Sequence, residues 1–226
     1  MELKNIEKAT FLSRPNRFCA NVLADGCEQT VHVKNTGRLR ELLVPGASVL
    51  LSRSDNENRK TKYDLVAVQK GKVLVSIDSQ AANGIAEEWL KKGVLFGKDA
   101  TIRREVTFGK SRFDFYIESE ERKIFLEVKG CTLERDGVAL FPDAPTERGV
   151  KHINELCQCI EKGFEAYILF VIQRKGISHF SPNDVTHPEF GQALRNAESR
   201  GVKILAVDCK VSENSVTACD FVDVVL

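Results

Sequence analysis

The chain has 226 residues, of which 42% are hydrophobic and 29% are charged, with 15 Gly and 6 Pro. This composition excludes a disordered chain and a collagen-like fibre. The longest apolar run, residues 166–172, is far shorter than the ~20 residues of a membrane-spanning helix, so we expect a soluble, cytoplasmic protein. The net charge of +1 is too small to indicate nucleic-acid binding by itself.

The first third of the chain predicts a small β-barrel. Five short strands are expected here, separated by turn residues at spacings typical of an all-β module. They are residues 17–24, 29–34, 48–52, 63–69 and 72–77. Five strands most resemble the OB architecture, although a small barrel of another topology has the same pattern. We therefore expect an OB-like domain over residues 1–78, with a helical turn or two near residues 38–44.

The rest of the chain predicts a mixed α/β domain over residues 79–226. The expected order is a helix, three strands, and then a helix–strand–helix–strand series. The helices are expected at 79–92, 146–162 and 188–200, and the main strands at 101–108, 112–119, 123–129, 166–173 and 202–209. The charge balance also divides here: residues 1–78 carry 13 Lys and Arg against 9 Asp and Glu, whereas the remainder carries 20 against 23.

Two of the predicted strands carry residues suited to phosphodiester chemistry. Side chains alternate along a strand, so the hairpin of residues 111–130 should place its apolar residues on one face and Asp114, Glu127 and Lys129 on the other. The apolar set is Phe113, Phe115, Ile117, Ile124, Leu126 and Val128. Two adjacent carboxylates favour a divalent cation such as Mg²⁺ or Mn²⁺ between them, and Lys129 could then orient water or stabilise phosphate.

This arrangement resembles the PD-(D/E)xK nuclease core. In that superfamily an Asp on one strand is followed, across a hairpin, by (D/E)xK on the next strand. Asp114 matches the first acid, and the Glu127-Val128-Lys129 segment matches the second element. Phe113 stands where the motif has Pro. A solvent-exposed strand face with a salt bridge between Glu127 and Lys129 accounts for the same residues, so both interpretations stay open.

A second polar cluster lies on the predicted helix 146–162. Its members follow one another at intervals of three or four residues, which puts them on one helix face. They are Arg148, Lys151, His152 and Glu155. The basic residues could contact phosphate and Glu155 could assist the metal; an ordinary solvated helix face explains the same spacing.

The barrel segment carries the residues expected to bind nucleic acid. OB barrels bind strands through basic grooves and stacked aromatic side chains. The candidate basic residues are Arg14, Arg17, Lys34, Arg38, Arg40 and Lys62, and Phe11 and Phe18 are aromatic residues nearby. Each of these has an equally ordinary interpretation, since the aromatic rings could be core and the cations common surface charges.

Five segments together resemble the sugar fermentation stimulation protein A family. They are RPNRF (14–18), HVKNTGRLRELLVPGA (32–47), SRFDF (111–115), LEVKGCTLE (126–134) and FPDAPTERGVKHINEL (141–156). The resemblance implies an OB-like barrel followed by a nuclease-like domain in a prokaryotic DNA-binding protein. It also implies a link to the regulation of sugar use, especially of maltose.

Three functions remain open from the sequence. The first is a DNA-binding protein without sequence preference that keeps a metal-dependent nuclease site at Asp114, Glu127 and Lys129. The second is a non-catalytic DNA-binding regulator with a vestigial nuclease core. The third is a sugar- or metabolite-sensing module, because OB folds also bind oligosaccharides.

Overall fold

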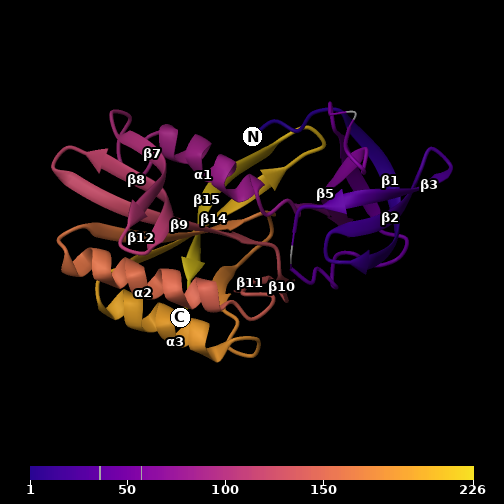
Figure 1. Ribbon diagram of the computed structural model, residues 1–226. Coiled ribbons are helices and arrows are strands. Elements are labelled where there is room, and N and C mark those ends of the chain that lie inside the picture. The colour runs from indigo at the N-terminus through magenta and orange to yellow at the C-terminus, as the bar shows by residue number, and fades with distance from the viewer. Residues whose placement is uncertain (36, 57) are drawn as a thin grey trace.

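The computed structural model describes residues 1–35, 37–56 and 58–226. It has a β-barrel at one end and a sheet with helices on both faces at the other (Figure 1). The predicted mixed α/β fold with an N-terminal OB-like barrel is confirmed. Within the described part of the chain, the helices are too short or too polar to cross a membrane.

The barrel is built from five strands and extended by a sixth. The strands are β1 (Ile6–Asn16), β2 (Cys19–Ala24), β3 (Cys27–Val33), β4 (Ser48–Arg53), β5 (Tyr63–Lys70) and β6 (Val73–Ser76). They form a sheet in the order β3-β2-β1-β4-β5-β6. A parallel pairing of β3 with β5 closes the first five into a barrel, which removes the open sheet edges.

Two details of the barrel differ from the sequence prediction. The long strand β1 was not expected, because charged residues and Pro15 interrupt its apolar alternation; the fifth predicted strand corresponds instead to β6, outside the closed ring. Residues 38–44 form a single turn, in which the Leu43 amide donates to the Leu39 carbonyl at 2.8 Å, so the expected helical turn does not extend into a helix. Leu39, Leu42 and Leu43 of this segment are buried in the barrel core.

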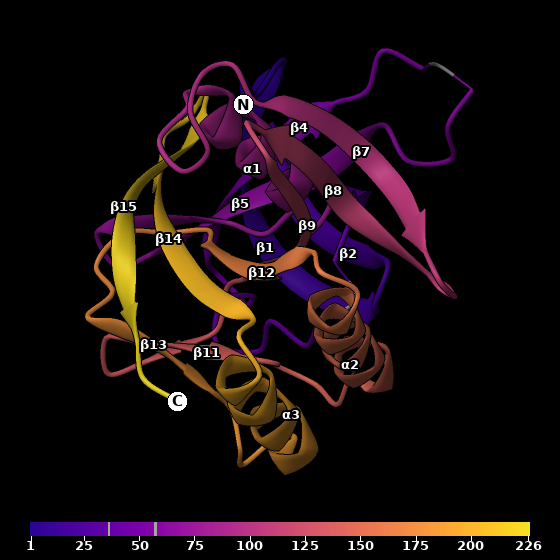
Figure 2. The same cartoon turned by 90° about the vertical axis from the view of Figure 1, so that its left-hand side faces the viewer.

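The second domain is a sheet covered on both faces. Its helices are α1 (Ala81–Lys91), α2 (Glu147–Glu161) and α3 (Pro188–Ser199). Its strands are β7 (Thr101–Phe108), β8 (Ser111–Ser119), β9 (Arg122–Cys131), β10 (Glu134–Arg135), β11 (Val138–Phe141), β12 (Glu165–Ile172), β13 (His179–Pro182), β14 (Lys203–Val211) and β15 (Val216–Val224). Helix α1 lies over one face, and α2 and α3 lie side by side over the other (Figures 1 and 2).

The central strands explain the long apolar runs in the sequence. The sheet order is β10-β11-β13-β15-β14-β12-β9-β8-β7, and β12 runs parallel to both β9 and β14. Strand β12 is buried along nearly its whole length because helices cover both faces. The short β13 and the longer β15, which lies between β13 and β14, were not predicted; β15 contains Asp220 and Asp223, which obscure its apolar alternation.

Polar contacts hold the barrel against the carboxyl ends of β9 and β12. The Gln173 side chain donates to Ser76 Oγ at 3.0 Å and to the Asp78 carbonyl at 2.9 Å. The Ser76 amide in turn donates to the Gln173 carbonyl at 3.0 Å. Lys70 of the barrel pairs with Glu134 at 3.0 Å. These contacts fix the two domains at the carboxyl ends of β9 and β12, near Glu127 and Lys129 of β9.

Candidate functional site

The two predicted acids meet where β8 separates from β9. The paired residues of this hairpin run from Ser119–Arg122 to Phe115–Leu126, so Asp114 comes next, opposite Glu127. Asp114 Oδ2 accepts a 2.8 Å hydrogen bond from the Val128 amide, and its Oδ1 accepts one of 2.7 Å from Asn83 of α1. The carboxylate thereby takes a place that a strand carbonyl would otherwise fill, and it is fixed beside Glu127.

The separation of the strands corrects the expected side-chain alternation. Phe113 was expected to share a face with Phe115 and Ile117. Those two residues pack beneath α1, whereas Phe113 lies in the core on the α2 side. Its ring centroid is 5.5 Å from that of Phe125 and 6.2 Å from that of His152. Once β8 leaves its partner at Asp114, the strict two-residue period of a paired strand no longer applies.

Glu127 is held by two neighbours through one of its oxygens. Lys129 Nζ donates to Glu127 Oε1 at 2.6 Å, and His152 Nδ1 contacts the same oxygen. Arg148 Nε donates to His152 Nε2 at 3.3 Å; since this assigns the lone pair to Nε2, Nδ1 carries the proton given to Glu127. Glu127 is only 3% exposed, and its Oε2 is buried with no partner among the described residues.

The local electrostatics differ between the two acids. Burial and the nearby charge of Glu127 raise the pKa of Asp114 above its usual value. Burial also opposes ionisation of Glu127, but the hydrogen bond from His152 and the charge of Lys129 together lower its pKa. Glu127 is therefore the more stable anion, and Asp114 is the acid whose ionisation would gain most from an added cation.

The residues present fit a hard divalent cation. The unpartnered Oε2 of Glu127 and the adjacent Asp114 carboxylate supply oxygen ligands of the kind that Mg²⁺ and Mn²⁺ prefer. The described residues contain no group of three or more His, Cys, Asp or Glu side chains placed to hold a metal. A cation here would take its other ligands from water or backbone carbonyls, which is usual for Mg²⁺.

Helix α2 places the second predicted cluster differently from expectation. Thr146 Oγ1 caps the helix by accepting from the Gly149 amide at 3.1 Å. Arg148 and Lys151 are exposed, but His152 and Glu155 are buried. His152 was expected to be free for phosphate and instead supports Glu127, because this part of the polar stripe faces the sheet. Glu155 Oε1 lies 3.8 Å from Lys151 Nζ, and Glu155 Oε2 is buried without a partner among the described residues.

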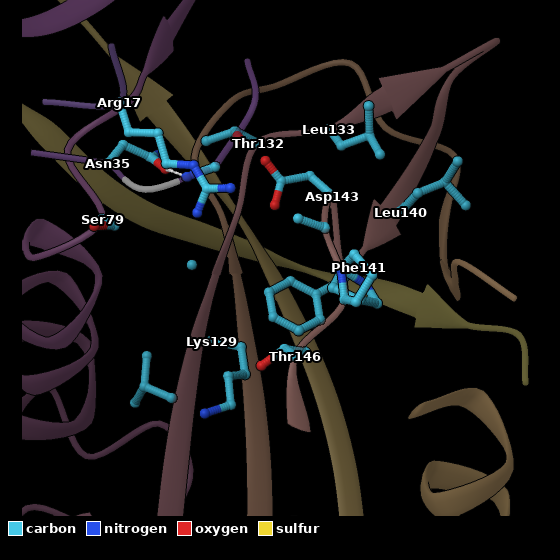
Figure 3. A pocket seen from close by; sticks show the side chains of 16 residues that line it. Arg17, Asn35, Ser79, Lys129, Thr132, Leu133, Leu140, Phe141, Asp143 and Thr146 are labelled. Carbon is cyan, nitrogen blue, oxygen red and sulfur yellow. Dashed lines mark hydrogen bonds between the residues drawn. The ribbon is translucent and has the colours of Figure 1, made fainter. Parts of the chain in front are cut away.

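A cleft between the two domains reaches this site through Lys129. It has a volume of about 320 Å³ and is lined by Arg17, Asn35 and Gly37 of the barrel, Val128–Gly130 of β9, and the loop that includes Phe141 and Asp143. Figure 3 shows Arg17 and Lys129 lining the cleft from different elements, with the Phe141 ring beside it and the Lys129 ammonium group directed away from Arg17. Lys129 is the one member of the predicted triad that lines the cleft.

A second cleft, of about 420 Å³, adjoins the first. Arg17 and Gly37 line both clefts, and the others lining the second are Arg14, Asn16, Arg38 and Arg40. Among the described residues, Arg17, Arg38 and Arg40 form no salt bridge, and all three are exposed. These three arginines place positive charge along the barrel edge, with the Asp143 carboxylate on the wall of the first cleft. Their contact with nucleic acid stays a prediction.

The other three predicted basic residues are engaged elsewhere. Arg14 donates to four backbone carbonyls, those of Arg17, Asn35, Gly37 and Arg38. Lys34 pairs with Asp64 at 2.7 Å. The ammonium group of Lys62 lies 5.0 Å from the ring centroid of Tyr63. Arg14 thus shapes the cleft wall, and Lys34 is neutralised by its partner.

Sequence reasoning missed Asn83 and Asp143. Asn83 lies inside α1, and its side chain donates to Asp114. Asp143 accepts from the Arg38 amide at 2.8 Å and so ties the loop after β11 to the barrel. An amide beside the apolar stripe of α1 was the available signal for Asn83. No local pattern marks Asp143, whose partner is 105 residues away along the chain.

Comparison with known proteins identifies the family. Residues 12–77 match the family described as "SfsA N-terminal OB domain", and residues 80–215 match "Sugar fermentation stimulation protein RE domain". Proteins named sugar fermentation stimulation protein homolog from Desulfitobacterium hafniense (strain DSM 10664 / DCB-2) and Clostridium beijerinckii are 58% and 52% identical to the chain. Both alignments span the whole chain and 99% and 100% of those relatives, respectively.

A solved structure has the same fold. Pyrococcus furiosus SfsA in complex with Ca²⁺ superposes with a TM-score of 0.91 at 29% sequence identity, covering 100% of this chain and 98% of that one. The agreement extends over both domains. The chain belongs to the sugar fermentation stimulation protein (SfsA) family.

Proposed function

We propose that this protein binds DNA without sequence preference along the arginine-lined clefts and hydrolyses phosphodiester bonds beside Asp114 and Glu127 with a divalent cation. One observation carries the proposal. A buried carboxylate oxygen without a partner among the described residues, Glu127 Oε2, belongs to an acid that lies beside Asp114, and Lys129 connects Glu127 to a cleft lined by Arg17.

Each group of the chain has a distinct part in this chemistry. Arg17, Arg38 and Arg40 bind backbone phosphates, which gives affinity without reading bases. Asn83 and the Val128 amide hold the Asp114 carboxylate in place, as His152 and Lys129 hold that of Glu127. A bound Mg²⁺ or Mn²⁺ would polarise the phosphate and lower the pKa of water. Lys129, on a flexible stem, moves from Glu127 toward phosphate when a strand enters the cleft.

Two findings from relatives support the proposal. The Pyrococcus furiosus protein was solved in complex with Ca²⁺, and a hard, oxygen-seeking cation of this kind suits the carboxylate pair described above. The family name refers to sugar fermentation. DNA binding gives a direct route to such an effect, through the expression of genes for sugar use, including maltose.

A specific observation favours a second candidate, a DNA-binding regulator that does not cleave. Glu127 is nearly sealed from solvent, and Lys129 is already paired with it. If Lys129 keeps this contact when DNA is bound, no amine is free for the phosphate. The clefts would then bind DNA, while the acid pair would serve only to stabilise the fold.

One experiment separates the two candidates. Labelled DNA is incubated with the protein and Mg²⁺ or Mn²⁺, alongside Asp114→Asn and Lys129→Ala, and both binding and cleavage are measured. The proposal expects binding by all three proteins and metal-dependent cleavage by wild type alone. Binding without cleavage under either metal leaves the regulator, and the absence of binding removes both candidates.

A further inference from the structure

One exposed aromatic side chain, Phe18, directly follows in the chain two residues that line the arginine-lined clefts, Asn16 and Arg17, although its own ring lines neither cleft. Phe18 is 57% exposed and lies with Arg17 in the turn that joins β1 to β2. The other predicted aromatic residue, Phe11, is 2% exposed and belongs to the barrel core. Phe18 therefore adds nothing to the core and leaves most of a large apolar ring in water.

The backbone around Phe18 is fixed from both sides. Its amide donates to Asn16 Oδ1 at 2.8 Å, and the Cys19 amide donates to the same oxygen at 3.0 Å. The Phe18 carbonyl accepts from the Val33 amide at 2.8 Å. Asn16 itself lines the second cleft. The ring is thus presented from a rigid turn whose neighbouring residues, Asn16 and Arg17, both line the clefts.

From this arrangement we infer that the preferred substrate is single-stranded DNA, with Phe18 stacking on an unpaired base while Arg17 binds the adjoining phosphate. The inference rests on the proposed function and names the substrate class of that site. An aromatic side chain can stack on a base only where the base is unpaired or at an end, and alternating cations and aromatic rings are the usual means of binding single strands.

The dimensions of the cleft favour the same substrate. A volume of about 320 Å³ lies at the lower end of pockets that hold a small organic ligand, which suits a strand segment better than a duplex. The cleft walls come from both domains, and these are tied together through Gln173 with Ser76 and through Arg38 with Asp143. A single strand needs no separation of these walls to reach Lys129.

The test compares single-stranded and duplex oligonucleotides of equal length by fluorescence anisotropy. Asp114→Asn is the background and EDTA is present, so that no substrate is cut. Phe18→Ala should weaken binding of the single strand by about 5- to 100-fold and change duplex binding by less than about 2-fold; Phe18→Tyr, which keeps a ring, should restore the loss. A 2-aminopurine base in the strand should be quenched on binding to the background protein and to its Phe18→Tyr variant, and not on binding to Phe18→Ala.

Phe221→Ala provides the matched control. Phe221 is 52% exposed, packs edge-to-face on Trp89 and, unlike Phe18, has no neighbour in the chain that lines either cleft, so its loss should leave both affinities unchanged. Tighter binding of duplex than of single strand by the parent protein, or an equal loss of both in Phe18→Ala, overturns this inference while DNA binding stands. Failure to bind either form overturns the proposed function as well.

Discussion

The arginine edge of the barrel and the acid pair of the second domain differ in how each side chain is held. Arg17, Arg38 and Arg40 are exposed and form no salt bridge among the described residues. Asp114 and Glu127 are enclosed and held by four donors from α1, α2 and β9. Exposed, mobile cations suit a ligand of variable sequence and shape, whereas a fixed acid pair suits chemistry at one point. Under the proposed function, this difference assigns DNA binding to the clefts and chemistry to the acid pair, which adjoins the first cleft at Lys129.

The strongest way to break this comparison is to remove charge from the acid pair. Asp114→Asn should lower cleavage of DNA by at least about 100-fold, because loss of a cation ligand costs more than the 10- to 100-fold typical of an outer partner. DNA affinity in EDTA should stay within about 2-fold of wild type. Gel-based cleavage and anisotropy titration check the two values; a parallel fall in both would place Asp114 in binding rather than chemistry.

A smaller effect is expected when the hydrogen bond from His152 to Glu127 is removed. His152→Ala removes the Nδ1 donor and should weaken Mn²⁺ binding by about 10- to 100-fold, measured by isothermal titration calorimetry. His152→Asn can place an amide donor near the same oxygen and should recover most of the affinity. Equal affinity in all three proteins would show that His152 does not orient Glu127.

In the barrel, we expect the ion pairs of Asp64 with Arg59 and Lys34 to stabilise the folded state. Burial opposes its ionisation, but hydrogen bonds from Arg59, Lys34 and His32 lower the pKa of Asp64 from 3.8 to about 2. The folded pKa lies below the unfolded one, so this stabilisation is complete above about pH 4 and is lost as pH falls toward 2; its size is about 2 kcal/mol. Urea unfolding between pH 5 and pH 2 should show that Asp64→Asn flattens this part of the stability profile. An unchanged slope would contradict the assignment.

The smallest expected effect lies at the exposed arginines. Arg40→Ala should weaken DNA binding severalfold and lower the slope of log affinity against log salt by about 1, without changing thermal stability. Anisotropy titrations at several salt concentrations measure the slope.

Arg14→Ala is the informative contrast on the same cleft wall. Its guanidinium satisfies four carbonyls, so its loss should lower the free energy of unfolding by about 1–3 kcal/mol. If Arg14→Ala and Arg40→Ala changed stability and DNA affinity in the same way, the assignment of Arg14 to the cleft wall and of Arg40 to DNA contact would be wrong.

The features that could be predicted were those that depend on short-range sequence patterns. The fold class followed from turn spacing in the barrel and from the apolar run of β12, and the convergence of Asp114 and Glu127 followed from two-residue alternation. The alternation failed at Phe113, where β8 leaves its partner strand. Strands β1 and β15 escaped prediction because charged residues interrupt their apolar faces.

Features that depend on distant contacts could not be predicted. The burial of His152 requires knowing which face of α2 meets β9, and its polar neighbours Arg148 and Lys151 suggested the opposite face. No sequence pattern distinguishes Arg14 from Arg17. Arg14 donates to backbone carbonyls, whereas Arg17 lines the cleft as an exposed cation. The cleft itself joins residues 17, 129 and 143, which no pattern of spacing connects.

The most direct test of the central claim is the position of a bound cation. Crystals soaked in Mn²⁺ and measured near the manganese absorption edge should show an anomalous peak in contact with the carboxylates of Asp114 and Glu127, and Asp114→Asn crystals should lack it. A peak elsewhere, or none at millimolar Mn²⁺ in the wild type, would contradict a cation-dependent site at this pair.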